Sequence, residues 1–119
     1  MGTRFVVAKE STVHENYKQR IIKAKDIDSV VTGRTHGHPV RGLRNQMTRE
    51  YTKLEQEGKS FEELEYLTLG ALRKAVQEGD VMNGTVMAGQ IAGMISKEQT
   101  CKEMIDEMME QAKKLLNRE

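Results

Sequence analysis

A glycine-containing stretch near the C-terminus has the composition of a loop that could approach a ligand. Residues 84–93 (GTVMAGQIAG) place Gly84, Gly89 and Gly93 among small and apolar residues. Glycine lets the backbone come close to a ligand, and N–H groups at a helix start can hold a phosphate. The stretch lacks the Lys and Ser or Thr that complete a Walker loop. The alternative is that the same small residues form a face where a helix packs tightly against a neighbour.

The histidines at positions 36 and 38 flank Gly37, and on an extended segment their side chains would share one face. Both imidazoles could therefore reach one metal ion. A zinc site needs three or four ligands that converge, and no third ligand is evident beside this pair. We therefore expect no metal site.

The same stretch is basic, and its cationic side chains are those of Arg34, His36, His38, Arg41 and Arg44. At a helix N-terminus, such a loop would suit a phosphate or an acidic protein surface. The alternative is a basic face that water solvates. Cys101 lies on an apolar stripe, where we expect a small hydrophobic side chain and not a nucleophile. The sequence supports no catalytic triad or dyad, so we assign no catalytic residue.

Composition excludes several classes of protein. The 119 residues are 37% hydrophobic and 31% charged, and 19 basic against 18 acidic side chains leave a net charge of +1. This balance is not that of a dedicated nucleic-acid binder. We expect no membrane span, because no run approaches about 18 apolar residues. We expect no secretory signal, because the apolar stretch at the start is short, and a single cysteine suits the reducing cytoplasm.

Hydrophobic patterns predict a mostly α-helical chain with one or two short strands. Thr3–Ala8 has the β-branched and aromatic content of a buried strand, and Asp28–Thr32 is a second strand-like piece. A helix of about three turns is expected from Thr12, which precedes Glu15 at capping-box spacing. Two strands do not make a stable sheet alone, and a buried strand needs neighbours on both edges. This imbalance suggests that the chain is part of a larger fold.

Three further helices are expected. The first would begin at Pro39, which suits a first helical turn, and continue to Gly58. The second would begin after Ser60 and end at Gly79. The third would begin after Thr100, where Glu103 completes a capping box, and it has the clearest apolar stripe in the chain.

Four segments together resemble a known superfamily. The opening MGTRFVVAKES resembles the last barrel strand and following turn of the nitronate monooxygenase (2-nitropropane dioxygenase) superfamily. The segments GHPVRGLRNQMTREY, LGALRKAVQEGD and GTVMAGQIAG follow in the order of one branch, the FMN-dependent enoyl-[acyl-carrier-protein] reductases II. Each motif is weak alone, but four in the right order identify the chain as similar to the C-terminal portion of that branch.

The resemblance implies the C-terminal fragment of an FMN-binding TIM (β/α)8 barrel, consisting of its last strand and a helical subdomain. Residues 1–12 would be the last barrel strand and turn, and 13–82 the helical subdomain. Residues 83–119 would be the return segment and a C-terminal helix that packs on the barrel. A typical barrel has about 250 residues, so the chain would be less than half of one.

The resemblance also implies where the cofactor would bind. Gly2 and Thr3 would help to hold the FMN phosphate, and phosphate sites after the last strands are a general feature of such barrels. Met87 and Gln90 would line the pocket near flavin and substrate. The catalytic histidine and most FMN contacts would lie outside this chain, and none of its own histidines inherits that role.

The implied activity is that of a flavin-dependent oxidoreductase of fatty-acid biosynthesis. Hydride would pass from NAD(P)H to FMN and then to the β-carbon of a trans-2-enoyl thioester on acyl carrier protein. The isolated chain is expected to be inactive. The resemblance leaves a homodimer open as the assembly of the enzyme. Nitronate oxidation in the same superfamily is the first alternative, and a helical binding or assembly module without enzymatic activity is the second. A basic face at Arg34, Arg41, Arg44 and Arg49 favours the reductase, because acyl carrier proteins are acidic.

Overall fold

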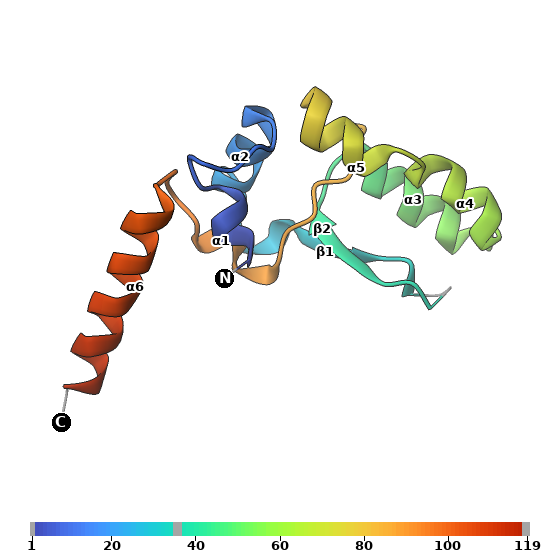
Figure 1. The fold of residues 1–119 in the computed structure, drawn as a ribbon. Coiled ribbons are helices and arrows are strands. Elements are labelled where there is room, and N and C mark those ends of the chain that lie inside the picture. Colours follow the sequence, from blue (N-terminus) through green and yellow to red (C-terminus); the bar gives the residue numbers. More distant parts are fainter. Residues whose placement is uncertain (1, 35–36, 118–119) are drawn as a thin grey trace.

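Short helices dominate the chain, and a two-stranded sheet lies near its middle (Figure 1). The structure, a computed structural model, describes residues 2–34 and 37–117, without the side chain of Phe61. The α-helices are α1 (Gly2–Val6), α2 (Glu15–Ile22), α3 (Gln46–Gln56), α4 (Phe61–Thr68), α5 (Ala71–Arg73) and α6 (Cys101–Leu116). Three short turns of other helical types are η1 (Asp26–Asp28), η3 (Lys74–Glu78) and η4 (Gln90–Met94).

The sheet pairs β1 (Ser29–Thr32) with β2 (Val40–Leu43) in antiparallel register. Val30 lies opposite Gly42, and Thr32 lies opposite Val40, so these four residues share one face. In Figure 1, α3, α4 and α5 lie to one side of the strands and α6 projects away on the other. The radius of gyration is 16.5 Å, whereas a compact domain of this length has about 13.5 Å. The chain therefore presents more open surface than a self-contained domain.

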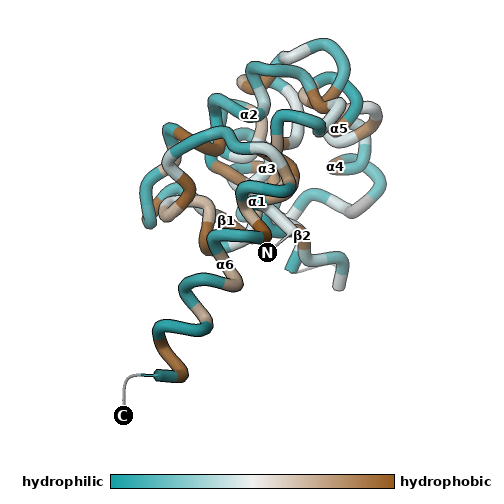
Figure 2. Tube along the Cα trace, turned by 60° about the vertical axis from the view of Figure 1, so that its left-hand side comes forward, coloured by the Kyte–Doolittle hydropathy of each residue, from teal (hydrophilic) through white to brown (hydrophobic). Residues whose placement is uncertain are grey.

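Two separate hydrophobic cores hold these elements. The larger one joins α2 to β2 and to the residues after position 85, with Ile21 and Leu43 fully buried. The smaller one joins α3 to α4 through Met47, Tyr51 and Leu64. Several apolar side chains on α6 remain exposed, namely those of Ile105, Met109, Leu115 and Leu116. Figure 2 shows hydrophobic and hydrophilic residues alternating along this helix.

The expected strand at Thr3–Ala8 is wrong, because this segment forms α1 and a turn. The N–H groups of Val7 and Ala8 donate to the carbonyls of Arg4 and Phe5, so the coil continues past Val6. A strand needs a neighbour to pair its backbone, and no strand in the described part of the chain lies beside this segment. A helix satisfies its own backbone groups. The described residues 2–12 therefore form no strand here, and the division of the chain at residues 12 and 82 stays a prediction.

The expected helix from Pro39 is wrong over its first residues. Val40–Leu43 is β2, and the helix α3 begins only after Asn45. Asn45 Oδ1 accepts the N–H of Thr48 at 3.0 Å, and Thr48 Oγ1 accepts the N–H of Asn45 at 2.9 Å. This reciprocal cap sets the start of the helix. Spacing alone could not separate the two structures, because an apolar residue every three or four positions also occurs in a short strand followed by a helix.

Helix ends were predicted best where a polar side chain caps them. Ser60 Oγ accepts the N–H of Glu63 at 3.3 Å, and Thr100 with Glu103 forms the expected capping box. The helix expected from Ser60 to Gly79 is not continuous, because α4 ends at Thr68 and Gly70 adopts a φ of 72°. Gly79, at a φ of 74°, ends only the short turn η3. The helix α2 instead begins after His14, whose Nδ1 accepts the N–H of Asn16, so the expected start at Thr12 is wrong.

The small residues after position 83 allow close packing, as the alternative interpretation of that stretch predicted. A Cβ atom added to Gly84 would lie 2.8 Å from the carbonyl oxygen of Ala71, and one added to Gly93 would lie 2.7 Å from the N of Asp26. The same holds for Gly42 in β2, where an added Cβ would lie 2.7 Å from the carbonyl oxygen of Val86. Side chains at these positions would force neighbouring backbone apart.

Substitution of Gly42 tests the close approach of β2 to the segment at Val86. We expect Gly42→Val to lower the free energy of unfolding by about 1–3 kcal/mol, because its side chain overpacks against backbone. Urea denaturation followed by circular dichroism measures this change. Gly2→Ala is the control, since an added Cβ at Gly2 meets no atom within 4 Å. An unchanged midpoint for Gly42→Val would show that the segment does not lie against β2.

Candidate functional site

Residues 86–88 run beside β2 and pair with it through one isolated β-bridge. The N–H of Leu43 donates to the carbonyl of Val86 at 2.9 Å, and the N–H of Ala88 donates to the carbonyl of Arg41 at 3.4 Å. Between these bonds Gly42 and Met87 form an antiparallel bridge. The return segment thus extends the sheet and brings Met87 to a defined position.

The hydroxyl of Tyr17 holds Met87 from a second direction. Tyr17 lies on α2, is 3% exposed, and donates its O–H to the carbonyl oxygen of Met87 at 2.8 Å. Burial raises the pKa of the Tyr17 phenol, so the group stays protonated and acts as a donor. The side chain of Met87 remains 41% exposed. The backbone is therefore fixed while the thioether faces open space.

Thr3 meets the return segment at its next residues. Thr3 Oγ1 accepts the N–H of Gly89 at 2.8 Å, across 86 positions of sequence. Gln90 follows as the first residue of η4, with an exposed side chain. The structure thus brings the Gly2–Thr3 step together with the segment that carries Met87 and Gln90. Their predicted contacts with FMN stay predictions.

A groove of about 270 Å³ lies between the sheet and the helices α3 to α5. Its floor is the face of the sheet that carries Val30 and Val40. Met47 and Tyr51 of α3 form one wall, and Met87 lies at the return segment. The remaining lining residues are Thr32, His38, Gly42, Thr48, Thr68, Leu72, Thr85 and Val86. Most of this lining is apolar, so the groove suits an aliphatic chain more than a charged group.

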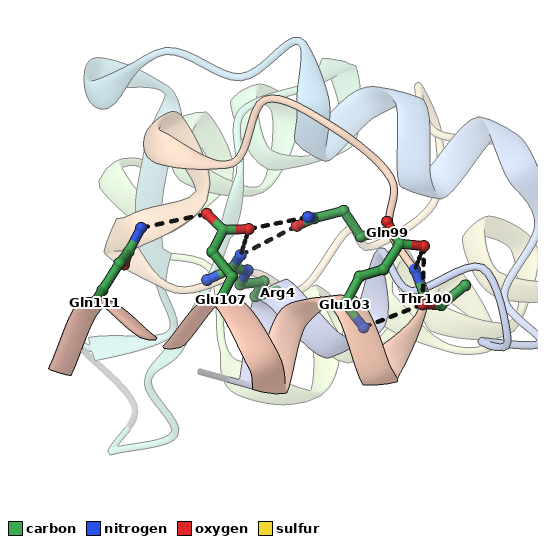
Figure 3. A network of polar contacts seen from close by, with 6 residues as sticks. All are labelled: Arg4, Gln99, Thr100, Glu103, Glu107 and Gln111. Atoms are coloured by element: carbon green, nitrogen blue, oxygen red, sulfur yellow. Dashed lines mark hydrogen bonds and ion pairs between the residues drawn. The ribbon is translucent and has the colours of Figure 1, made fainter. Parts of the chain in front are cut away.

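A polar network joins α1 to α6 (Figure 3). Arg4 Nη2 donates to Gln99 Oε1 and to Glu107 Oε2, both at 3.0 Å, and Gln99 Nε2 donates to the same Glu107 oxygen at 2.9 Å. The hydrogen bond from Gln99 and the charge of Arg4 keep the pKa of Glu107 below its usual range. Thr3 is the neighbour of Arg4 on α1, so this network helps to fix the position of Thr3.

The beginning of α6 is tied to the same region by its backbone. Both carboxylate oxygens of Glu10 lie 3.1 Å from the N of Cys101, whose N–H they accept. The N–H bond from Cys101 keeps the pKa of Glu10 below its usual range. The Cys101 side chain is half-buried at the helix start, and partial burial raises the pKa of its thiol, which fits the expected packing role.

The expected basic loop is not one continuous site. His36 lies outside the described residues, and Arg41 is half-buried, with its Nη1 donating to Ser29 Oγ at 2.8 Å. Arg34 and Arg44 are exposed at different ends of the hairpin. No group of three or more His, Cys, Asp or Glu side chains within residues 2–34 and 37–117 is placed to hold a metal ion.

Sequence reasoning missed the residues that position the site. Tyr17, Arg4 and Gln99 are not singled out by any pattern in the sequence analysis. Their roles depend on partners 70 to 103 positions away. One indication for Gln99 was present in the sequence, because it is a polar residue directly before Thr100, the residue that caps α6. Nothing in a single sequence shows which distant residue it meets.

Comparison with known proteins identifies relatives of the whole chain. The family model described as nitronate monooxygenase matches residues 1–111. The structure of FabK from Thermotoga maritima superposes with a TM-score of 0.92 and is 41% identical, covering 99% of this chain and 37% of FabK. A probable nitronate monooxygenase of Staphylococcus saprophyticus is 26% identical over 99% of this chain and 33% of its own length.

A third relative carries a more specific name. It is the (3aS,4S,5R,7aS)-5-hydroxy-7a-methyl-1-oxo-octahydro-1H-indene-4-carboxyl-CoA dehydrogenase of Mycobacterium tuberculosis, 25% identical over 92% of this chain and 41% of its own length. The chain thus spans between a third and two fifths of the length of these relatives. No helix within the described residues is long and apolar enough to cross a bilayer.

Removal of the Thr3 hydroxyl tests the link between α1 and the return segment. In Thr3→Val the Gly89 N–H loses its acceptor, and we expect its hydrogen exchange to accelerate by about tenfold, which corresponds to the worth of one hydrogen bond. Amide exchange followed by NMR measures this rate. Thr3→Ser keeps the hydroxyl and is expected to keep the slow exchange. Equal rates in all three proteins would show that Thr3 does not hold Gly89.

Proposed function

The chain belongs to the nitronate monooxygenase family, and from that membership we propose that it supplies the C-terminal portion of an FMN-dependent enoyl-[acyl-carrier-protein] reductase. The substrate would be a trans-2-enoyl thioester, and NAD(P)H would be the reductant. The reaction is a step of fatty-acid elongation. The observation that carries this proposal is the likeness of nearly the whole chain to FabK, at 41% identity and a TM-score of 0.92.

The residues around the Gly2–Thr3 step suit the phosphate of FMN. The first turn of α1 holds no acidic residue, and its N–H groups have no acceptor within the helix. A Cβ added to Gly2 would meet nothing within 4 Å, so a ligand can approach the backbone there. Backbone N–H groups without a nearby negative charge are the donors that an anion needs. These observations support Gly2 and Thr3 as phosphate-binding residues.

The flavin supplies the redox chemistry when it is bound. The residues of this chain position the substrate and exclude water. Thr3 orders the return segment through Gly89. Tyr17 fixes the backbone of Met87, whose exposed side chain would cover one side of the substrate pocket. Gln90 offers an amide that both donates and accepts, which suits a thioester carbonyl or a flavin edge.

A second relative supports thioester chemistry in this family. The name of the Mycobacterium tuberculosis protein describes a carboxyl-CoA compound as its substrate. Coenzyme A and acyl carrier protein present their acyl groups on the same phosphopantetheine arm. In this proposal the groove of about 270 Å³ that ends at Met87 holds part of such a thioester substrate.

Nitronate oxidation by flavin and oxygen is the second candidate. It is favoured by the names of several curated relatives, among them the probable nitronate monooxygenases of Staphylococcus saprophyticus and Bacillus subtilis. The two are 26% and 24% identical to this chain, whereas FabK is 41% identical. The higher identity makes the reductase the first candidate.

A chimera tests the proposal. Residues 1–119 would replace the matched third of Thermotoga maritima FabK, and the purified protein would be assayed for bound FMN, for NAD(P)H-dependent reduction of a trans-2-enoyl thioester, and for nitronate oxidation. We expect a yellow protein whose reductase kcat/KM lies within about tenfold of that of FabK, a loss of about 1.4 kcal/mol in transition-state stabilisation.

Two variants of the chimera complete the test. Thr3→Val is expected to weaken FMN binding, whereas Lys113→Gln, at an exposed position of α6, is expected to change neither binding nor rate. A chimera that binds FMN and oxidises nitronates, but reduces no enoyl thioester, would contradict the reductase and favour the second candidate.

A further inference from the structure

A basic hollow lies between α3 and the sheet residues near Val30 and Arg44, next to the groove. Its volume is about 370 Å³, and its lining includes Arg44, Arg49 and Lys53. Two threonines, Thr48 and Thr52, also line it, and none of its lining residues is acidic. Arg49 and Lys53 are four positions apart on α3 and therefore lie on one face of that helix. Three cationic groups thus surround one shallow pocket.

Within residues 2–34 and 37–117, no carboxylate forms an ion pair with these cations. The ion pairs of the described residues involve Arg4, Lys18, Arg20, Lys102 and Lys114, and none involves the three cations of the hollow. Like charges held together without a counterion repel one another, so a bound anion would be stabilising there.

The backbone near Arg44 is fixed on both sides. Its N–H donates to the carbonyl of Asp28 at 2.8 Å, and its carbonyl accepts from Arg20 Nη2 at 2.8 Å. The positive N-terminal end of α3 begins two residues later, and its first turn carries no acidic residue. The helix therefore adds to the positive potential of the hollow.

The hollow and the groove are neighbours across two shared residues. Val30 and Thr48 line both of them. From this shared edge the groove continues, with apolar lining, to Met87. The arrangement suits a ligand with a compact anion at one end and a less polar body that passes over Val30.

We propose that the basic hollow binds the phosphate of a phosphopantetheine thioester, and that the arm passes over Val30 into the groove towards Met87. The proposal rests on the proposed function, since it places the carrier of that substrate. Arginine side chains match phosphate oxygens in bidentate geometry, and two of the three cations are arginines. A phosphate fits a recess of this size, and the recess adjoins the groove at Val30 and Thr48. Coenzyme A and acyl carrier protein share this phosphate.

Titration of the 119-residue chain with a matched pair of probes tests the proposal. The probes are 4′-phosphopantetheine and pantetheine, which differ only in the phosphate, and binding would be followed by NMR at the amides of Val30, Thr48 and Thr52. We expect the phosphorylated probe to bind at least about tenfold more tightly at low salt, with the difference shrinking as salt rises.

Two double variants with equal loss of charge separate a specific site from general attraction. R49Q/K53Q is expected to remove the preference for the phosphorylated probe and to leave pantetheine binding unchanged. K9Q/K113Q, at exposed positions outside the hollow, is expected to keep the preference. Circular dichroism and thermal melting check that each variant is folded, and R49K, which keeps the charge, is expected to retain most of the affinity. Equal binding of the two probes, or a preference that R49Q/K53Q retains, would overturn the proposal.

Binding of an acyl carrier protein with and without its phosphopantetheine arm distinguishes recognition of the phosphate from recognition of an acidic protein surface. We expect the holo form to bind more tightly than the apo form, and the difference to depend on Arg49 and Lys53. Equal binding of both forms would show recognition of the protein surface and would overturn the proposal. These measurements need neither flavin nor turnover. If the chimera is active but the 119-residue chain binds both probes equally, only this inference is refuted. If the chain prefers the phosphorylated probe but the chimera is inactive, only the proposed function is refuted.

Discussion

The pairing of residues 86–88 with β2 is the interaction on which the rest of the structure depends. It joins two segments more than 40 positions apart through the hydrogen bond between Leu43 and Val86. The pairing is allowed because Gly42 has no side chain to hold the two backbones apart. It also adds hydrogen bonds at Arg41 and Leu43 to the outer edge of a two-stranded sheet, which is marginal alone.

Both parts of the candidate site follow from this pairing. On one side it places Met87 under the hydroxyl of Tyr17 and Gly89 against Thr3, so α1 and the return segment form one unit. On the other side it closes the groove that α3 and the sheet begin. The network of Arg4, Gln99 and Glu107 (Figure 3) then ties α6 to the same unit. The far half of α6 stays exposed.

Local chemistry explains which elements could be predicted. The helix starts at Ser60 and Thr100 were foreseen because each cap involves side chains only three positions apart. The segments Thr3–Ala8 and Val40–Leu43 were assigned wrongly, because the choice between helix and strand there depends on distant neighbours. The bridge between Met87 and Gly42 was missed for the same reason. The small residues in 84–93 indicated close packing. That this segment packs against Gly42 could be seen only in the structure.

Native-state hydrogen exchange of Leu43 and Ala88 tests the central pairing most directly. Both N–H groups donate across the interface between β2 and the return segment. If the pairing organises the molecule, both amides should open with the same free energy as the amide of Ile21 in the larger core, and respond to denaturant together with it. Exchange of Leu43 and Ala88 at the rates of an unstructured chain, while Ile21 stays protected, would contradict this account.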